Sequence, residues 1–280
     1  MPGRIAVGVD GSEESTAAVD WAADEAALRG AQLRLLNASL WQEHALVAVQ
    51  PARDVLAERA RNLLDAMTDR ARTRHSGILI SSEEVEDAPE TLLVSASADA
   101  DLVVLGSHGF GTGVGFTAGS VGQEVAAKAH SPVVLVRGVK PAGGGRVVVG
   151  LDVRSPGEEL LEFAFDFAAR HSVPVHVVHT WHLTALHHPM HPHGEGSKAA
   201  EAGQAALSEA VRPYRERFPQ VEVEEEATAG RAADRLVEAT AGAAIAVVGR
   251  RRNARGSHLG PVTHAVIHHA GCPVAVVPHT

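Results

Sequence analysis

Short runs of apolar residues alternate along this chain with longer stretches in which apolar residues recur every three to four positions. The short runs are rich in Val, Ile and Leu and do not alternate with polar residues, which is typical of parallel strands covered by helices on both faces. They predict strands at residues 4–9, 32–39, 77–84, 101–106, 132–137, 146–151, 173–180, 220–227, 243–249 and 273–278.

The longer stretches predict amphipathic helices between these strands. Two apolar faces show the helical spacing well: Ala17, Ala18, Trp21, Ala22, Ala26 and Leu28 in the first half, and Leu160, Leu161, Ala164, Phe165 and Ala168 in the second. Strands that alternate with helices predict an α/β fold, with a doubly wound, five-stranded parallel sheet in each half. Periodicity alone leaves the order of the strands open.

The pattern repeats, and so do the residues that form it. Arg4–Asp10 returns as Arg146–Asp152, Ala100–Gly106 as Ala243–Gly249, and Ser131–Val136 as Cys272–Val277. Three matches in the same order at nearly the same offset indicate a duplication. We therefore expect one domain over residues 1–139, a Pro- and Gly-containing linker over 140–145, and a second domain over 146–280.

Composition removes several classes of protein. One Cys among 280 residues excludes a disulfide framework, and no apolar run reaches the ~20 residues of a membrane span. A net charge of -9 disfavours binding to nucleic acid. The three Lys residues all lie outside Gly-rich turns, which excludes a phosphate-loop NTPase. No secretory signal is visible at the start of the sequence, so the expectation is a cytoplasmic protein without a membrane partner.

A Gly-rich loop follows the fourth predicted strand. It runs from Gly106 to Gly119 with six glycines in fourteen residues, and Ser120 then leads into a predicted helix over 121–129. Glycines let the backbone approach a ligand closely, and the free N–H groups of a helix start favour a phosphate. Lys and Arg are absent from the loop, so backbone amides would do most of the binding.

Three other interpretations of this loop are possible from the residues. The first is a plain surface loop with a Ser cap, although the position of the loop between a strand and a helix favours a ligand. A dinucleotide fingerprint belongs after the first strand, where this chain has Val9-Asp10-Gly11-Ser12. A hydrolase elbow requires G-x-S-x-G, which neither Ser107 nor Ser120 provides.

Gly106-x2-Gly109-x9-Gly119-Ser120, together with the first and last strands, resembles the ATP-binding branch of the universal stress protein family. The resemblance covers essentially the whole chain as a tandem pair. It implies an open, Rossmann-like fold similar to that of adenine-nucleotide hydrolases, with ATP and Mg²⁺ as ligands. It also implies pairing through the last strand, as a homodimer or as a pseudo-dimer within one chain.

The resemblance also assigns the nucleotide-binding residues. Gly8 and Asp10 would lie at the adenosine end, and the backbone of Ala38 would face adenine. The phosphate path would be formed by Gly106, Gly109, Gly111, Gly113, Gly119, Ser120 and the amide of Val121. From the residues alone, Asp10 could equally cap neighbouring backbone.

The second half departs from this pattern. Arg252 stands at the second motif glycine and Pro261 at the serine, with the spacer two residues shorter, although Gly249 and Gly260 remain. Asp152 corresponds to Asp10, and Thr180 takes the place of Ala38. The basic residues Arg250, Arg251, Arg252 and Arg255 form either a solvated or inter-domain turn or a charged grip on phosphates. We expect the first domain to bind ATP better.

Other candidates have simpler interpretations. The His-rich segment 179–193, with His179, His182, His187, His188, His191 and His193, suggests an exposed loop, with metal binding as the alternative. His264 and His268 suggest a packed helix face, Cys272 a small buried residue, and the acidic run at 222–226 an exposed edge strand.

The expected function is therefore a nucleotide-responsive stress-tolerance or regulatory factor, in which ATP binding orders the loop seen by an unknown protein partner. One alternative is a slow ATPase or nucleotidyl-transfer enzyme with His108 near the phosphates, and the sequence assigns no catalytic or metal residue to it. The other alternative is a module that oligomerises without ATP.

Overall fold

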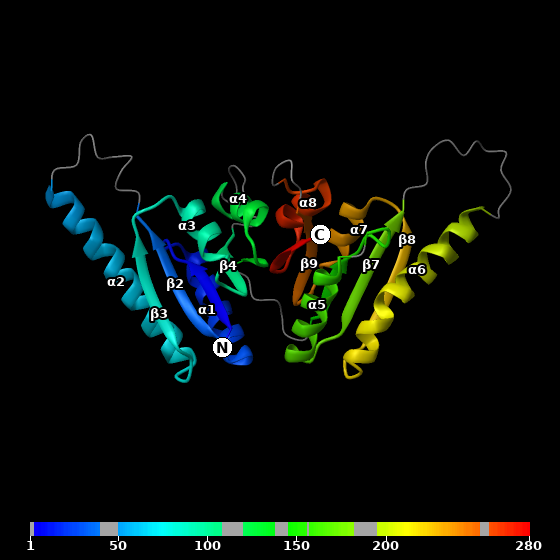
Figure 1. Ribbon diagram of the computed structural model, residues 1–280, viewed down its shortest axis with the longest axis horizontal. Helices are drawn as coiled ribbons and strands as arrows, with labels where there is room; N and C mark the ends of the chain where they lie inside the picture. Colours follow the sequence, from blue (N-terminus) through cyan, green and yellow to red (C-terminus); the bar gives the residue numbers. More distant parts are fainter. Residues whose placement is uncertain are drawn as a thin grey trace. The chain divides into compact units, whose positions relative to one another are not determined.

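The computed structural model describes residues 3–39, 50–107, 120–137, 145–155, 157–181, 195–252 and 258–280. The chain divides into two compact units, Met1–Val139 and Lys140–Thr280. Most of the predicted linker, residues 140–144, lies outside the described residues. Each unit is a parallel sheet with helices on its faces (Figure 1).

The first unit contains strands β1 (Arg4–Gly8), β2 (Gln32–Ala38), β3 (Ile80–Val85), β4 (Leu102–Gly106) and β5 (Val133–Val136). Its helices are α1 (Glu13–Arg29), α2 (Gln50–Arg74), α3 (Pro89–Ala96) and α4 (Ser120–Lys128). The strands lie in the order β3-β2-β1-β4-β5, and all the pairs are parallel. Helices α1 and α2 contact each other, as do α3 and α4, which gives one helical layer on each face of the sheet.

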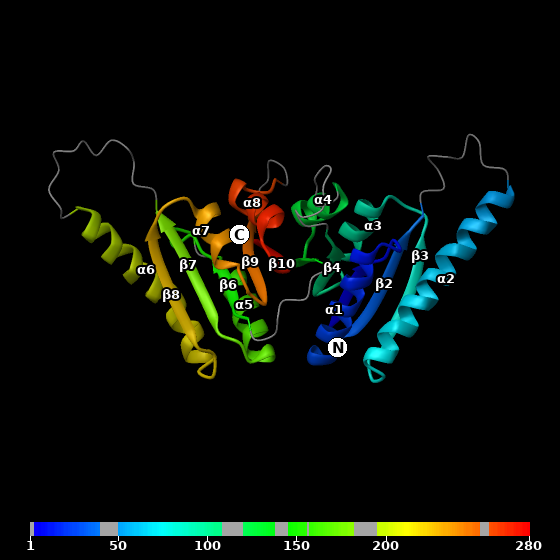
Figure 2. The same cartoon turned by 180° about the vertical axis from the view of Figure 1, so that it is seen from behind.

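The second unit repeats this plan. Its strands are β6 (Val147–Gly150), β7 (Val175–Trp181), β8 (Val223–Ala229), β9 (Ile245–Arg251) and β10 (Val274–His279). Its helices are α5 (Glu158–His171), α6 (Glu195–Arg217), α7 (Ala232–Ala239) and α8 (Pro261–His269). The order is β8-β7-β6-β9-β10, again with parallel pairs (Figure 2).

The core of each unit lies between the sheet and its helices. Strand β4 is buried from Leu102 to Leu105, as its uninterrupted apolar run predicts. In the second unit Phe165 is fully buried and packs against the rings of Tyr214 and Phe218 at 5.4 and 5.9 Å between centroids. The doubly wound α/β prediction is confirmed, and every strand lies within three residues of its predicted position.

Some predictions about faces and burial were wrong. Leu28 is 49% exposed, because it lies on the opposite side of α1 from the buried stripe that contains Ala22 and Ala26. The predicted acidic edge strand is confirmed for β8, which lies at the end of its sheet order with Glu222 and Glu224 exposed. Glu225 departs from this prediction, because its side chain is only 6% exposed and accepts hydrogen bonds from Ser208 and Gln204.

Among the described helices none is long and apolar enough to cross a membrane.

Candidate functional site

The strand order of the first unit brings the predicted nucleotide residues to one edge of the sheet. Strand β1 lies between β2 and β4, and the chain changes its direction of winding between β1 and β4. A crevice opens beyond the carboxyl ends of the strands at such a point. Asp10 follows β1, Ala38 ends β2 and Gly106 ends β4, so these three residues lie at the same edge.

Asp10 organises the turn between β1 and α1. Its Oδ1 accepts hydrogen bonds from the backbone N–H of Ser12 at 2.9 Å and from its hydroxyl at 2.6 Å. Ser12 in turn caps α1 by accepting from the N–H of Ser15. Partial burial favours the neutral carboxyl, but the bonds from Ser12 outweigh it and hold the pKa of Asp10 below its usual value. Asp10 therefore has the local capping role and is an anion at neutral pH.

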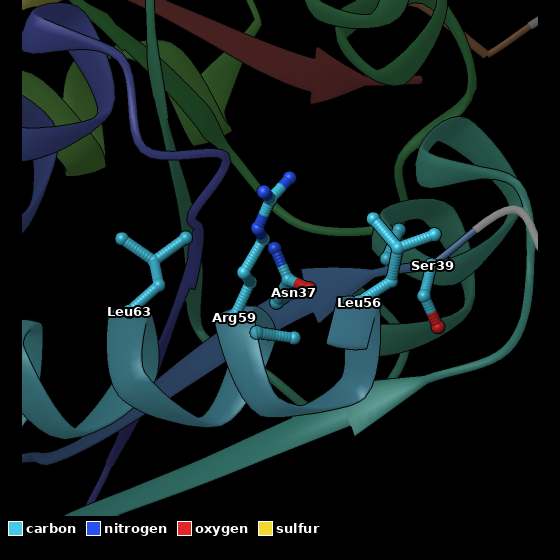
Figure 3. Close-up of a pocket in the computed structure, with 7 residues that line it drawn as sticks. Asn37, Ser39, Leu56, Arg59 and Leu63 are labelled. Atoms are coloured by element: carbon cyan, nitrogen blue, oxygen red, sulfur yellow. The ribbon is translucent and has the colours of Figure 1, made fainter. Parts of the chain in front are cut away.

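A cavity of about 270 Å³ opens beside this turn (Figure 3). It is lined by Asn37, Ala38, Ser39, Leu56, Arg59, Ala60 and Leu63. Asn37 and Ala38 end β2 and Ser39 follows them, and Leu56, Arg59 and Leu63 extend toward these residues from successive turns of α2. A Cβ placed on Gly11 would lie 3.6 Å from Leu63, so this wall of the cavity reaches the turn that follows Asp10.

Asn37 connects the cavity to the first strand. The residue is 9% exposed, and its Nδ2 donates a hydrogen bond of 2.7 Å to the carbonyl of Val9. The backbone N–H of Val9 donates to Leu36 at 2.8 Å. These bonds extend the contact between β1 and β2 to the residue that precedes Asp10.

The glycines that end the strands are required by packing. A Cβ on Gly106 would lie 2.4 Å from the carbonyl carbon of Glu14 in the first turn of α1. A Cβ on Gly8 would lie 2.7 Å from the side chain of Leu105. Gly106 therefore excludes larger residues whatever the crevice binds, because the clash is with backbone, whereas at Gly8 the side chain of Leu105 would have to shift.

The phosphate side of the predicted site is described only in part. Ser120 is exposed and forms the first residue of α4, with Val121 half-buried behind it. His108 and the loop glycines at 109, 111, 113 and 119 lie outside the described residues. Ser107, just after β4, is 2% exposed, and its hydroxyl has no hydrogen-bond partner in the part of the chain that the structure describes.

The second unit has a larger cavity, of about 490 Å³, at the corresponding edge. The register explains the correspondence, because Gly150 pairs with Val178 as Gly8 pairs with Leu36. Two residues further on, Thr180 stands in the place of Ala38. Thr180 lines the cavity, as the sequence comparison of the two halves predicts.

Asp152 in this cavity is bound by arginines. Its Oδ1 accepts from the backbone N–H of Arg154 at 3.2 Å and from Nε of the same residue at 3.1 Å. The guanidinium of Arg251 lies 3.4 Å from Oδ2. Burial raises the pKa of Asp152, but the hydrogen bonds and charge of Arg154, assisted by Arg251, lower it more. The carboxylate that matches Asp10 is thus ionised and paired.

The prediction of a solvated Arg turn was wrong for Arg250, which is buried in β9. Alternate residues of β9 face opposite sides, so Arg251 lines the cavity while Arg250 is 5% exposed on the other side of the strand. Burial, followed by the charge of Arg252, lowers the pKa of Arg250. Arg252 is exposed, and Arg255 lies outside the described residues.

The histidine predictions were also partly wrong. His179 lies in β7, is 7% exposed and donates from Nδ1 to the carbonyl of Leu151 at 3.0 Å. The other histidines of the predicted His-rich loop lie outside the described residues. His264 is exposed and His268 is half-buried, with their Nε2 atoms 3.2 Å apart, so the pair is not a packed helix face. The described residues contain no group of three or more metal-ligating side chains.

Cys272 is buried, as predicted.

Sequence reasoning missed Asn37, Arg59 and Arg154. Asn37 had a visible signal, since it is a polar residue in a strand that is otherwise buried at that point, and His179 occupies the same place in the repeat. Arg59 had none, because only the packing of α2 against the end of β2 brings it to the cavity.

The sequence matches the Universal stress protein family over residues 1–137 and again over 145–278. A universal stress protein of Mycolicibacterium smegmatis is 32% identical over 289 residues, which cover 98% of this chain and 96% of that protein. Universal stress protein Rv2005c of Mycobacterium tuberculosis is 30% identical over 97% of this chain and 96% of its own.

The fold is similar to that of known structures as well. The crystal structure of a universal stress protein from Archaeoglobus fulgidus aligns over 99% of this chain and 98% of its own, with a TM-score of 0.75 at 17% identity. Two family matches in one chain, together with relatives of matching length, establish that this protein belongs to the universal stress protein family as a tandem pair of its domains.

Proposed function

We propose that the first unit binds ATP together with Mg²⁺ and that the protein acts in the cytoplasm as a nucleotide-responsive regulatory or stress-tolerance factor. The observation that carries this proposal is the convergence of three features at one edge of the sheet. These are the ionised Asp10 after β1, the cavity at Ala38 after β2, and the start of α4 at Ser120 after the Gly-rich loop. Crevices of this kind are the usual ligand sites of open α/β sheets.

The described residues at this edge support the proposal at three points of a nucleotide. The cavity between β2 and α2 presents the backbone of Ala38 and the apolar side chains of Leu56 and Leu63, which suits a planar base. A carboxylate such as Asp10 accepts hydrogen bonds from ribose hydroxyls. The hydroxyl of Ser120 and the free N–H groups of the first turn of α4 would hold phosphate oxygens.

Mg²⁺ would be carried mainly by the phosphates. The described residues include no cluster of three metal-ligating side chains, and Mg²⁺ in nucleotide sites commonly keeps water and phosphate ligands. In this arrangement the cation would neutralise charge on the phosphates, while the chain supplies amides and one hydroxyl.

The test exchanges the residues that differ between the two units. Ser120→Pro removes both a hydroxyl and an N–H, and it places in α4 the residue with which α8 begins, so the helix start should survive. Hydrogen bonds to charged groups are worth about 1.5–3 kcal/mol. We therefore expect calorimetry on the full chain to show ATP binding weakened by about ten- to a hundredfold.

The control is Pro261→Ser, which alters the matching position of the second unit and should leave ATP binding within about twofold of the parent, a change of only about 0.4 kcal/mol. Equal affinity of the parent and the Ser120→Pro chain would contradict the proposed site. Pairing through the last strand, which family membership suggests, is a separate proposal that light scattering of the purified chain would test.

A further inference from the structure

We propose that the second unit contains a separate site for a small organic anion, a molecule with an apolar body and one carboxylate or phosphate group, and that ATP is not its ligand. The site is the cavity of about 490 Å³ at the carboxyl edge of the second sheet. This inference goes beyond the nucleotide binding proposed for the first unit and does not depend on it.

The charges that line the cavity leave an excess of positive charge. Arg154 and Arg251 are both part of the lining, and Asp152 is the only carboxylate among the described residues that line it. Lysine is absent from the same lining. Two guanidinium groups against one carboxylate favour a ligand that brings one further negative group.

The arginines hold Asp152 loosely. The side-chain contacts of Arg154 with Asp152 measure 3.1 and 3.5 Å, and that of Arg251 measures 3.4 Å. In the same unit, the bidentate pair between Arg170 and Asp166 measures 2.7 and 3.0 Å. The Asp152 contacts are therefore long for charge-assisted bonds.

The guanidinium groups also have donors to spare. A guanidinium carries five N–H groups, and only Nη2 of Arg251 contacts Asp152. The other N–H groups of the Arg251 guanidinium have no partner in the described part of the chain. The planar fork of such a group matches a carboxylate or a phosphate.

The inner wall of the cavity is apolar. Leu160, Leu236 and Val248 line it and are each no more than 4% exposed. The volume falls within the range of about 300–1,000 Å³ that is typical of small-molecule sites. An apolar or aromatic body would bury its surface against this wall, with its anionic group at the arginines near the mouth.

Three features argue against a triphosphate in this cavity. Helix α8 begins with Pro261, which has neither an N–H nor a hydroxyl to offer to a phosphate. The loop before it is two residues shorter than the Gly-rich loop of the first unit. His279 also crowds the end of β9, since its Nε2 would lie 2.7 Å from a Cβ placed on Gly249.

The test uses three ring compounds of similar size on the full chain. Benzoate and phenyl phosphate are the anionic probes, and benzamide is the neutral control. Ligand-observed NMR titration measures each affinity for the parent and for the double variant Arg154→Gln/Arg251→Gln. The matched control is Arg212→Gln/Arg217→Gln, which removes the same charge from exposed ion pairs of α6 in the same unit.

At least one of the anionic probes should bind, and benzamide should bind at least about tenfold more weakly, which corresponds to about 1.4 kcal/mol. The Arg154→Gln/Arg251→Gln chain should lose about tenfold in affinity for that anion, while the control pair should lose less than about twofold. The same anion should bind the Ser120→Pro chain as it binds the parent, whether or not ATP binding in the first unit holds.

Four outcomes would overturn the proposal. They are failure of both anions to bind, equal binding of benzamide, anion binding that is unchanged in the Arg154→Gln/Arg251→Gln chain, and ATP binding that is weakened by this variant as strongly as the anion is. Thermal unfolding of both double variants checks that they fold. If the cavity pair fails to fold, the single variant Arg251→Gln is used, because its guanidinium is 54% exposed and has one loose contact.

Discussion

The side-chain Nδ2 of Asn37 donates a hydrogen bond of 2.7 Å to the carbonyl of Val9, the residue immediately before Asp10. His179 makes the matching contact in the second unit, where its Nδ1 donates to the carbonyl of Leu151 before Asp152. A carbonyl oxygen can only accept, so Nδ1 of His179 carries the hydrogen. Two different side chains thus fix the position of the aspartate in the two units.

Replacing Asn37 should therefore destabilise the first unit. Asn37→Leu would leave the carbonyl of Val9 buried without its partner, which costs about 1–3 kcal/mol. Asn37→His places the residue of the second unit at this position and should cost less, because Nδ1 can donate to the same carbonyl. Urea unfolding of the full chain measures both. A Leu variant that is as stable as the parent would show that the bond contributes nothing.

Gly106 should tolerate no side chain, even in the absence of nucleotide. In Gly106→Ala the new Cβ would meet the backbone of Glu14 at 2.4 Å, and overpacking of this kind costs about 1–3 kcal/mol or more. Gly77→Ala is the matched control, since its Cβ would meet nothing within 4 Å. Thermal unfolding of the two chains should separate them clearly, and equal midpoints would contradict the close packing of α1 on β4.

Arg59 should contribute to nucleotide affinity and little to stability. It lines the cavity beside Asn37 and makes no hydrogen bond or ion pair with the described residues (Figure 3). A guanidinium over a bound base is worth about 0.5–1 kcal/mol at an exposed site, so Arg59→Gln should weaken ATP binding about two- to fivefold. Arg61→Gln, with the same change of charge on α2 but outside the cavity lining, is the control for calorimetry. Equal losses in both variants would mean that only net charge matters.

Asp24 should make stability depend on pH in the acid range. It accepts two hydrogen bonds from Arg74, the longer at 2.6 Å, and one from His75 at 2.7 Å. Burial raises the pKa of Asp24, but these bonds, that of Arg74 first, lower it below its usual value. A lowered pKa in the folded state stabilises the protein at neutral pH, and this contribution is lost as the pH falls below about 4.

Asp24→Asn should therefore lower the free energy of unfolding at pH 7 by about 0.5 kcal/mol, the scale of a partly exposed ion pair. The difference from the parent should shrink as the pH falls toward 3, where the parent carboxylate also takes up a proton. Asp69→Asn on α2, which removes an acidic group that is 80% exposed, should show almost no such dependence. A difference that grows on acidification would contradict the sign of the effect.

Several features were readable from local sequence. The strands were predicted because covered parallel strands require uninterrupted Val, Ile and Leu, and β4 and β9 both carry such runs. The duplication was visible as repeated residues, and Pro261 at the helix start could be matched to Ser120 without coordinates. Leu28 shows the limit of this reasoning, since helical spacing indicates an amphipathic face but leaves open where that face ends.

The sequence by itself determined the tandem α/β fold, the family and the contrast between a Gly-and-Ser loop and an Arg-and-Pro loop, because these depend on residues close together in the chain. Only the tertiary structure decided which distant residues meet. It brought Arg59 of α2 to the end of β2, and it buried Arg250 while turning Arg251 toward Asp152. Strand order and helix packing set these distances, and neither is encoded in the period of a hydrophobic pattern.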